Sequence, residues 1–185
     1  MTPSPTRQTV RRLLIAGAAL AALAPASVPA QAPAPTKPQA PGAPSVQQAY
    51  GAWTLICAPA RTGGEVCEVQ QAALNDKGQT VAVAALMRKG SELDLRIDLP
   101  IGVYLRKNPV LQVDKGAARD GLSYLRCTPR VCIARMTITA SLLDALRRGG
   151  ELAVTFNRSS RQTASATFSL KGFPDAEKAF AARAR

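Results

Sequence analysis

From Tyr50 onward, apolar and polar residues mostly alternate along the chain, which is the pattern of half-buried β-strands. The clearest case is the segment 93–99, in which aliphatic and charged residues take turns: Leu93, Asp94, Leu95, Arg96, Ile97, Asp98 and Leu99. We expect further strands at 53–57, 66–74, 79–87, 103–105, 110–113, 122–127, 131–138, 153–156 and 164–170. Turn formers such as Asn75-Asp76-Lys77-Gly78 separate them, so short strands at regular spacing predict a sandwich or a barrel.

Two segments instead have the period of a helix. Residues 141–148 start with a capping-box pattern, Ser141-x-x-Asp144, and end before Gly149. Residues 174–182 have proline in the first turn, acids early and bases late, which suits the helix dipole. We therefore predict a mainly β fold, an antiparallel β-sandwich with one short internal helix and a C-terminal helix.

The first thirty residues have the pattern of an export signal. Arg7, Arg11 and Arg12 precede an apolar run at 13–24, and small residues follow up to Ala30. The run is shorter than the roughly 20 residues that a membrane-spanning helix needs. We expect residues 1–30 to be a cleaved signal peptide, leaving no transmembrane helix; a surface helix or a signal anchor is the alternative. Arg11-Arg12 leaves both the general and the twin-arginine export routes open.

The next segment, residues 31–48, is rich in proline and alanine. Such a composition favours extended chain and buries little apolar surface. We interpret it as a disordered linker, either a spacer or simply a loose N-terminus, and place the folded domain at residues 49–185.

Composition narrows the chemistry. The chain has 185 residues, of which 46% are hydrophobic, so it can build a buried core. It contains no histidine, which excludes Ser-His-Asp and Cys-His catalysis and histidine-ligated zinc. The formal charge is +12, and residues 31–185 keep 21 Lys and Arg against 12 Asp and Glu, or +9. We therefore expect no cofactor, no bound metal and no enzymatic activity.

The four cysteines, Cys57, Cys67, Cys127 and Cys132, all lie in the predicted domain. An exported chain with an even number of cysteines usually forms disulfides. Three pairings exist, and the two local pairs, Cys57 with Cys67 and Cys127 with Cys132, each flank turn residues and would fit hairpins. Their spacings match neither a zinc finger nor a C-x-x-C redox motif, which leaves metal binding and redox activity as the weaker alternatives.

Basic residues concentrate in the second half of the domain. Residues 119–161 contain three acids and eight arginines: Arg119, Arg126, Arg130, Arg135, Arg147, Arg148, Arg158 and Arg161. Arginine suits phosphate and carboxylate, so these are candidate anion-binding residues. The plainer interpretation is a solvated basic face that keeps the protein soluble. Nucleic acid is not expected as a partner, because export removes it from reach and stacking aromatics are scarce.

Three other features have structural explanations. Trp53, the single tryptophan, is expected to pack in the core beside a disulfide, with stacking on a ligand as the alternative. Asp94 and Asp98 could serve as paired carboxylates in glycosidase chemistry, but such alternation is routine on an exposed strand face. Gln70 and Gln71 are expected to have a structural role rather than to meet a partner.

Six motifs in order give the chain a family resemblance. They are Trp53-x-x-x-Cys57, Cys67-Glu68-Val69-Gln70-Gln71, Leu99-Pro100-Ile101-Gly102-Val103, the segment Arg126–Cys132, Leu146-Arg147-Arg148-Gly149, and Ser169-Leu170-Lys171-Gly172-Phe173. With both cysteine pairs, this set resembles the invasion-associated locus B family of small exported proteins over about residues 50–180. Arg130 and Pro174-Asp175 depart from the family pattern without affecting the fold.

The resemblance implies a β-rich domain that is periplasmic or secreted, with outer-membrane association left open. It implies no catalytic mechanism. We therefore expect a non-enzymatic envelope accessory or interaction protein, with a role in host-cell invasion or adhesion only weakly implied. Its expected partner is a protein or an anionic envelope component such as lipopolysaccharide or phospholipid head groups. The alternative is a periplasmic small-molecule or lipid-binding module with an apolar pocket between the sheets.

Overall fold

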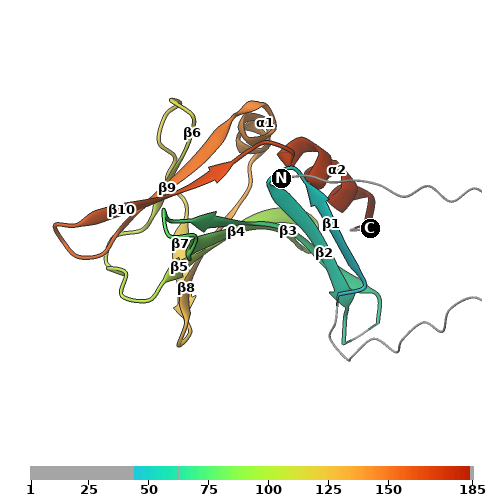
Figure 1. Ribbon diagram of the computed structural model, residues 1–185, viewed down its shortest axis with the longest axis horizontal. Helices are drawn as coiled ribbons and strands as arrows, with labels where there is room; N and C mark the ends of the chain where they lie inside the picture. Colours follow the sequence, from blue (N-terminus) through green and yellow to red (C-terminus); the bar gives the residue numbers. More distant parts are fainter. Residues whose placement is uncertain (1–43, 62, 184–185) are drawn as a thin grey trace, which may run out of the picture. The chain divides into compact units, whose positions relative to one another are not determined.

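A computed structural model describes residues 44–61 and 63–183, which form ten strands and two helices (Figure 1). The predicted signal peptide and most of the predicted linker lie outside these residues. The elements are β1 (Val46–Tyr50), β2 (Trp53–Pro59), β3 (Glu65–Leu74), β4 (Thr80–Lys89), β5 (Glu92–Pro100), β6 (Val110–Val113), β7 (Ser123–Cys127), β8 (Val131–Thr137), α1 (Ala140–Arg148), β9 (Glu151–Asn157), β10 (Thr163–Ser169) and α2 (Phe173–Arg183).

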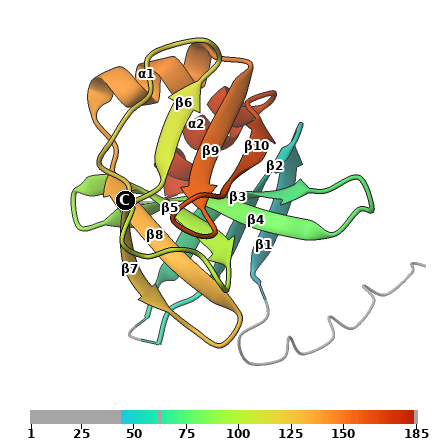
Figure 2. The ribbon, with the colours of Figure 1, turned by 90° about the vertical axis from the view of Figure 1, so that its left-hand side faces the viewer.

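The strands form two sheets, in both of which every pairing is antiparallel. One sheet has seven strands in the order β1-β2-β3-β4-β5-β8-β7, and the other has three in the order β10-β9-β6. Figure 2 shows the smaller sheet lying across the larger one, with α1 beside β6. The predicted class, mainly β with two antiparallel sheets, two helices and two disulfides, is confirmed.

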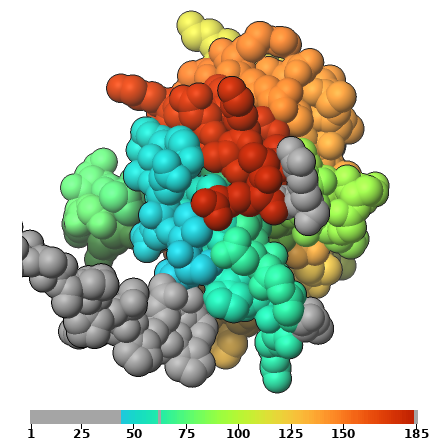
Figure 3. All heavy atoms as spheres, turned by 90° about the vertical axis from the view of Figure 1, so that its right-hand side faces the viewer, coloured from blue at the N-terminus to red at the C-terminus, as the bar shows by residue number. Residues whose placement is uncertain are grey.

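One apolar core lies between the two sheets and the helices. Strand alternation supplies it: Leu95, Ile97 and Leu99 of β5 are fully buried, and so are Leu152 and Val154 of β9. The C-terminal helix closes one side through Phe173 and Phe180, which belong to the same buried cluster. Figure 3 shows α2 lying against the β1–β2 hairpin, so this helix is part of the domain rather than an appendage.

The folded domain begins earlier than predicted. Strand β1 starts at Val46, inside the segment 31–48 that we assign to the linker. It pairs residue by residue with β2, from Val46 opposite Cys57 to Tyr50 opposite Trp53. Backbone pairing with a buried neighbour explains this strand, because its own sequence has little apolar pattern.

Two local predictions were also wrong. Residues 103–105 form no strand but part of a loop, in which Tyr104 N donates a 2.7 Å hydrogen bond to the carbonyl of Asn157. The cap of α1 is Thr139 rather than Ser141: Thr139 is extended and its hydroxyl accepts from Leu142 N. Both residue types cap well, and the start of the helix at Ala140 decides between them. Among the residues described, no helix is long and apolar enough to cross a membrane.

Candidate functional site

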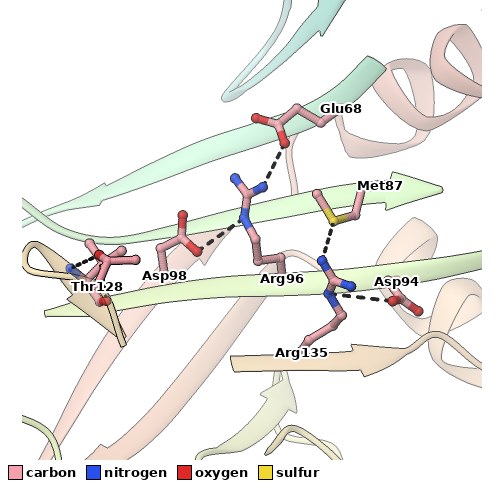
Figure 4. Close-up of polar contacts among 8 residues, drawn as sticks. Glu68, Met87, Asp94, Arg96, Asp98, Thr128 and Arg135 are labelled. Atoms are coloured by element: carbon pink, nitrogen blue, oxygen red, sulfur yellow. Dashed lines mark hydrogen bonds and ion pairs between the residues drawn. The ribbon is translucent and has the colours of Figure 1, made fainter. Parts of the chain in front are cut away.

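The outer face of the seven-stranded sheet has a cluster of charged side chains at its centre. Alternation places Asp94, Arg96 and Asp98 of β5 on the side opposite the buried leucines. The register sets Met87 of β4 next to Asp94 and Arg135 of β8 next to Arg96. Figure 4 shows these side chains extending toward one another across neighbouring strands.

The cluster is made of ion pairs, two of which link different strands and one of which lies within β5. Arg96 lies 3.1 Å from Glu68 and 3.2 Å from Asp98, and so connects β5 to β3. Arg135 lies 3.7 Å from Asp94 and also contacts the sulfur of Met87 at 3.4 Å. Asp94 additionally accepts a 2.9 Å hydrogen bond from the hydroxyl of Thr137. Cross-strand pairs of opposite charge stabilise a sheet, and this cluster joins its four central strands, β3, β4, β5 and β8.

This face is less exposed than the sequence suggests. The side chain of Asp94 is 1% exposed and that of Asp98 is 18% exposed. Interpreting both as residues of an open strand face was therefore wrong, because side chains from β4 and β8 cover them. Burial raises the pKa of Asp98 most, while Arg96 lowers it and Glu68 raises it further.

The cluster suits structure better than catalysis. Glycosidase chemistry needs one carboxyl that donates a proton and one that is free to act as base or nucleophile. Here Asp94 faces Arg135, and Asp98 faces Arg96, so each carboxylate already has a cationic partner. The arrangement holds the strands together and leaves neither acid free to attack a substrate.

The structure separates the eight candidate arginines. Two of them lie in ion pairs. Arg135 pairs with Asp94. Arg147 pairs with Glu177 of α2, whose Oε2 accepts hydrogen bonds from Nε and Nη2 of Arg147 at 3.1 and 2.9 Å. Arg126 and Arg130 lie on the β7–β8 hairpin, where Arg130 borders a pocket of about 180 Å³. The candidates therefore do not form a single cluster on the fold.

The remaining four arginines border two other pockets. Arg119 and Arg148 line a pocket of about 290 Å³ beside the end of α1. Asp114 lines it too, but its carboxylate accepts from the backbone N–H groups of Gly150 and Glu151. Arg158 and Arg161 line a pocket of about 700 Å³ at the β9–β10 turn, and no acid lines that pocket.

An apolar pocket lies next to the β9–β10 turn. It measures about 280 Å³, and its walls include Leu74, Val81, Phe156 and Arg158. Trp53 lines none of these four pockets. It is instead 1% exposed, packs edge-to-face on Phe173 at 5.0 Å, and donates a hydrogen bond to Ser169. Its predicted place in the core is confirmed.

Both local cysteine pairs form disulfides. Cys57 and Cys67 lie opposite each other in the β2–β3 pairing, and Cys127 and Cys132 do so in the β7–β8 pairing. Each bridge therefore joins the two strands of a hairpin. The carboxylate of Glu65 lies within 4.8 Å of the first pair, but bonded sulfurs offer a metal no thiolate. The disulfide interpretation is confirmed for all four cysteines.

Sequence analysis missed two basic residues near the β9–β10 turn. Arg106 and Lys107 are exposed in the loop between β5 and β6, outside the arginine-rich region 119–161. The bond from Tyr104 to Asn157 brings this loop beside the end of β9. A usable signal existed, because the segment 101–109 contains bases but no acid.

A corner between the two sheets shows why Gln71 has a structural role. Its amide is buried and donates to the carbonyls of Ala52 and Ser169, at 3.0 and 3.1 Å. Nearby, Gly51 and Gly172 both have positive φ, and a Cβ on Gly172 would lie 2.1 Å from the carbonyl oxygen of Tyr50. This corner therefore needs glycine, for space as well as for conformation.

Comparison with known proteins agrees with the motifs. The family model described as invasion associated locus B (IalB) protein matches residues 53–181. Two curated relatives from Brucella abortus, strains 2308 and biovar 1 9-941, are both named invasion protein B homolog. Each is 30% identical over 134 residues, which covers 71% of this chain and 77% of the relative.

A solved structure agrees with the fold. It is the crystal structure of invasion associated protein B from Bartonella henselae, with a TM-score of 0.67 and 24% identity. The match covers 75% of this chain and 96% of that one. At this identity the comparison supports the architecture and not a shared activity.

Proposed function

Because the chain belongs to the invasion-associated locus B family, we propose that it acts as an exported, non-enzymatic interaction protein of the cell envelope. One observation carries the proposal: the acids that could have done chemistry are paired with arginine, while other arginines are left at the surface. Asp94 and Asp98 each face a guanidinium, whereas Arg158 and Arg161 border an open pocket without an acid. Such a molecule is built to bind a partner rather than to turn over a substrate.

Export is supported by the cysteines. Two disulfides in two separate hairpins are typical of proteins that fold in an oxidising compartment such as the periplasm. The first thirty residues, in which arginines precede an apolar run, have the pattern of a signal peptide that would direct the chain to that compartment. A periplasmic or secreted location is therefore part of the proposal, and so is contact with the outer membrane.

The non-enzymatic part rests on the available side chains. The chain has no histidine, and its cysteines are bonded to each other. The most buried carboxylates serve in ion pairs, and no serine or lysine adjoins a base in the contacts described above. The curated relatives are named as invasion proteins, and a role in host-cell invasion or adhesion is the finer function that we attach to this chain.

A small-molecule or lipid-binding module is the second candidate. The pocket of about 280 Å³ between β10 and the end of the β3–β4 hairpin favours it, because Leu74, Val81 and Phe156 give it apolar walls. Its volume is just below the roughly 300 Å³ at which the usual range for ligand sites begins. The core itself is closed around Trp53, so a ligand would have to bind at this edge rather than between the sheets.

Chemical crosslinking in intact cells, followed by mass spectrometry, tests the leading proposal. The expected product is the disulfide-bonded chain linked to an envelope component. A chain that stays in the cytoplasm with four free thiols, or that links to no envelope component, would overturn it.

A further inference from the structure

We propose that one end of the domain docks on an anionic lipid surface. This end, the lipid-docking end, consists of the loop residues 101–107 and the β9–β10 turn residues 158–162. The proposal rests on the proposed function and names its partner class: a membrane surface that carries phosphate head groups.

Two segments far apart in sequence meet at this end. Tyr104 N donates a 2.7 Å hydrogen bond to the carbonyl of Asn157, the last residue of β9. Gly102 lines the same pocket as Arg158 and Arg161. Figure 2 shows the loop after β5 passing beside the turn between β9 and β10. The two segments therefore form one surface.

The charge of this surface has a single sign. It contains four exposed bases, Arg106, Lys107, Arg158 and Arg161, and neither of the two segments contains an acid. Within the part of the chain that the structure describes, none of the four forms an ion pair. Arg135 and Arg147, by contrast, are both paired with acids. The charges at the lipid-docking end remain available for an external anion.

Two aliphatic side chains accompany these bases. Ile101 is 56% exposed and Leu105 is 53% exposed, although both are large and apolar. Exposed aliphatic residues among unpaired bases are typical of surfaces that insert into the head-group region of an anionic membrane. A purely solvated basic face would not need them. An acidic protein partner is the other possible occupant, and the vesicle test below separates it from a lipid surface.

The pocket of about 700 Å³ offers a place for a head group. Arg158, Arg161, Gln162 and Thr163 line it, so charged and hydrogen-bonding groups surround an open space. The turn itself is fixed: Arg158 N donates to the carbonyl of Gln162 at 2.9 Å, and the Ser159 hydroxyl accepts from Gln162 N at 3.1 Å. The two guanidinium groups therefore extend from a defined loop rather than a loose one.

The test is co-sedimentation of the full chain with vesicles of phosphatidylcholine, with and without phosphatidylglycerol. The neutral vesicles measure the background retention due to the apolar segment 13–24. Comparing each variant with the unaltered chain cancels the attraction that Arg7, Arg11 and Arg12 add on anionic vesicles. We expect additional retention on anionic vesicles that falls steeply when salt is raised to about 0.5 M. Each basic residue near such a surface contributes about fivefold to partitioning, so R158Q/R161Q should bind about 25-fold more weakly.

A matched variant controls for total charge. K89Q/K171Q removes two exposed bases, one at the end of β4, next to the turn before β5, and one just after β10. It should leave anionic partitioning within about twofold of the unaltered chain, because both bases lie at the strand ends opposite the lipid-docking end. Equal losses in the two variants would show that net charge alone drives retention, and would overturn the proposal. No preference for anionic over neutral vesicles would also overturn it.

The aliphatic residues are tested in the same way. I101S/L105S should lower partitioning on anionic vesicles, whereas L125S, which alters a side chain that is 59% exposed on β7, should not. Unchanged partitioning of I101S/L105S would contradict insertion. All these side chains are exposed, and a far-UV circular dichroism spectrum checks that each variant folds. Failure on vesicles together with an envelope protein crosslinked in cells would remove the lipid proposal and leave the proposed function intact.

Discussion

The indole N–H of Trp53 donates a 2.8 Å hydrogen bond to the backbone carbonyl of Ser169. This bond joins β2 of the larger sheet to the last residue of β10 in the smaller one, across 116 positions of sequence. The same carbonyl accepts from the Gln71 amide at 3.1 Å. The two sheets are therefore joined by polar contacts as well as by the core, at the point where the chain turns into α2.

Replacing Trp53 should separate packing from hydrogen bonding. W53A removes a fully buried ring and should destabilise the domain by about 3–5 kcal/mol. W53F keeps much of the ring volume, and Ser169 keeps its bond from Gln71, so we expect less than half of that loss. Urea unfolding followed by circular dichroism measures both. Equal losses would contradict packing as the main contribution of the Trp53 ring.

Gly172 should tolerate no side chain. Its φ is +86°, and a Cβ there would lie 2.1 Å from the carbonyl oxygen of Tyr50. G172A should therefore cost about 3 kcal/mol or more, because backbone must move. The matched control is G78A: its φ is +72°, but nothing lies within 4 Å of the new Cβ. G78A should reduce the free energy of unfolding by only about 1–2 kcal/mol, which is the cost of a left-handed conformation for alanine. Similar losses would argue against the close contact.

Arg135 should matter through Asp94. R135Q leaves a carboxylate that is 1% exposed without its guanidinium partner. Breaking a buried pair costs several kcal/mol, but Arg135 is itself 30% exposed, so we expect about 1–3 kcal/mol. R126Q, on the neighbouring strand β7, should change stability by less than about 0.5 kcal/mol. Adding D94N to R135Q should recover part of the loss, and no recovery would argue against the pairing.

Asp98 should make stability fall as the pH rises. Burial raises its pKa above the ordinary value of 3.8, although Arg96 opposes the shift. The folded state therefore binds more protons than the unfolded state just above that pH, so the free energy of unfolding decreases as the pH rises through this window. D98N removes this titration, so its stability relative to the wild type should increase as the pH rises above about 3.8. The urea midpoints of the two proteins are measured against pH. A constant difference between them, or a wild type that becomes more stable relative to D98N as the pH rises, would contradict the raised pKa.

The two disulfides should each add stability. They close short loops with sequence separations of 10 and 5, for which about 2–3 kcal/mol is expected from restriction of the unfolded chain. C57A/C67A should lose more than C127A/C132A, because Cys57 and Cys67 are both buried while Cys127 is exposed. Fluorescence of the single tryptophan during urea unfolding measures the loss. Unchanged stability in either double variant would argue that its bridge is not formed in the purified protein.

Local patterns predict much of this fold. The alternation in residues 93–99 gives β5 and its inward leucines, and the turn at Asn75 to Gly78 gives the β3–β4 hairpin. Strand β1 escapes prediction, because it depends on pairing with β2 rather than on its own residues. The opposite error occurs at 103–105, where apolar residues lie exposed or half-buried in a loop.

The candidate site is harder to predict, because it depends on contacts between distant segments. Counting charges along the chain singles out residues 119–161, but Arg135 and Arg147 in that range are in ion pairs. Arg106 and Lys107 lie outside that range, and only the folding of their loop against the end of β9 places them near Arg158. Charge in sequence thus indicates an anionic partner without locating the surface, since pairing and loop contacts decide which bases remain available.

The central claim is that the protein is an exported binding protein whose surface meets the cell envelope. A photo-crosslinking amino acid placed at Leu105, with Leu125 as the matched exposed control, tests this most directly in intact cells. The account predicts that the disulfide-bonded chain is recovered outside the cytoplasm, crosslinked to an envelope component from position 105 and much less from position 125. A cytoplasmic chain with free thiols, or no envelope crosslink from either position, would contradict it.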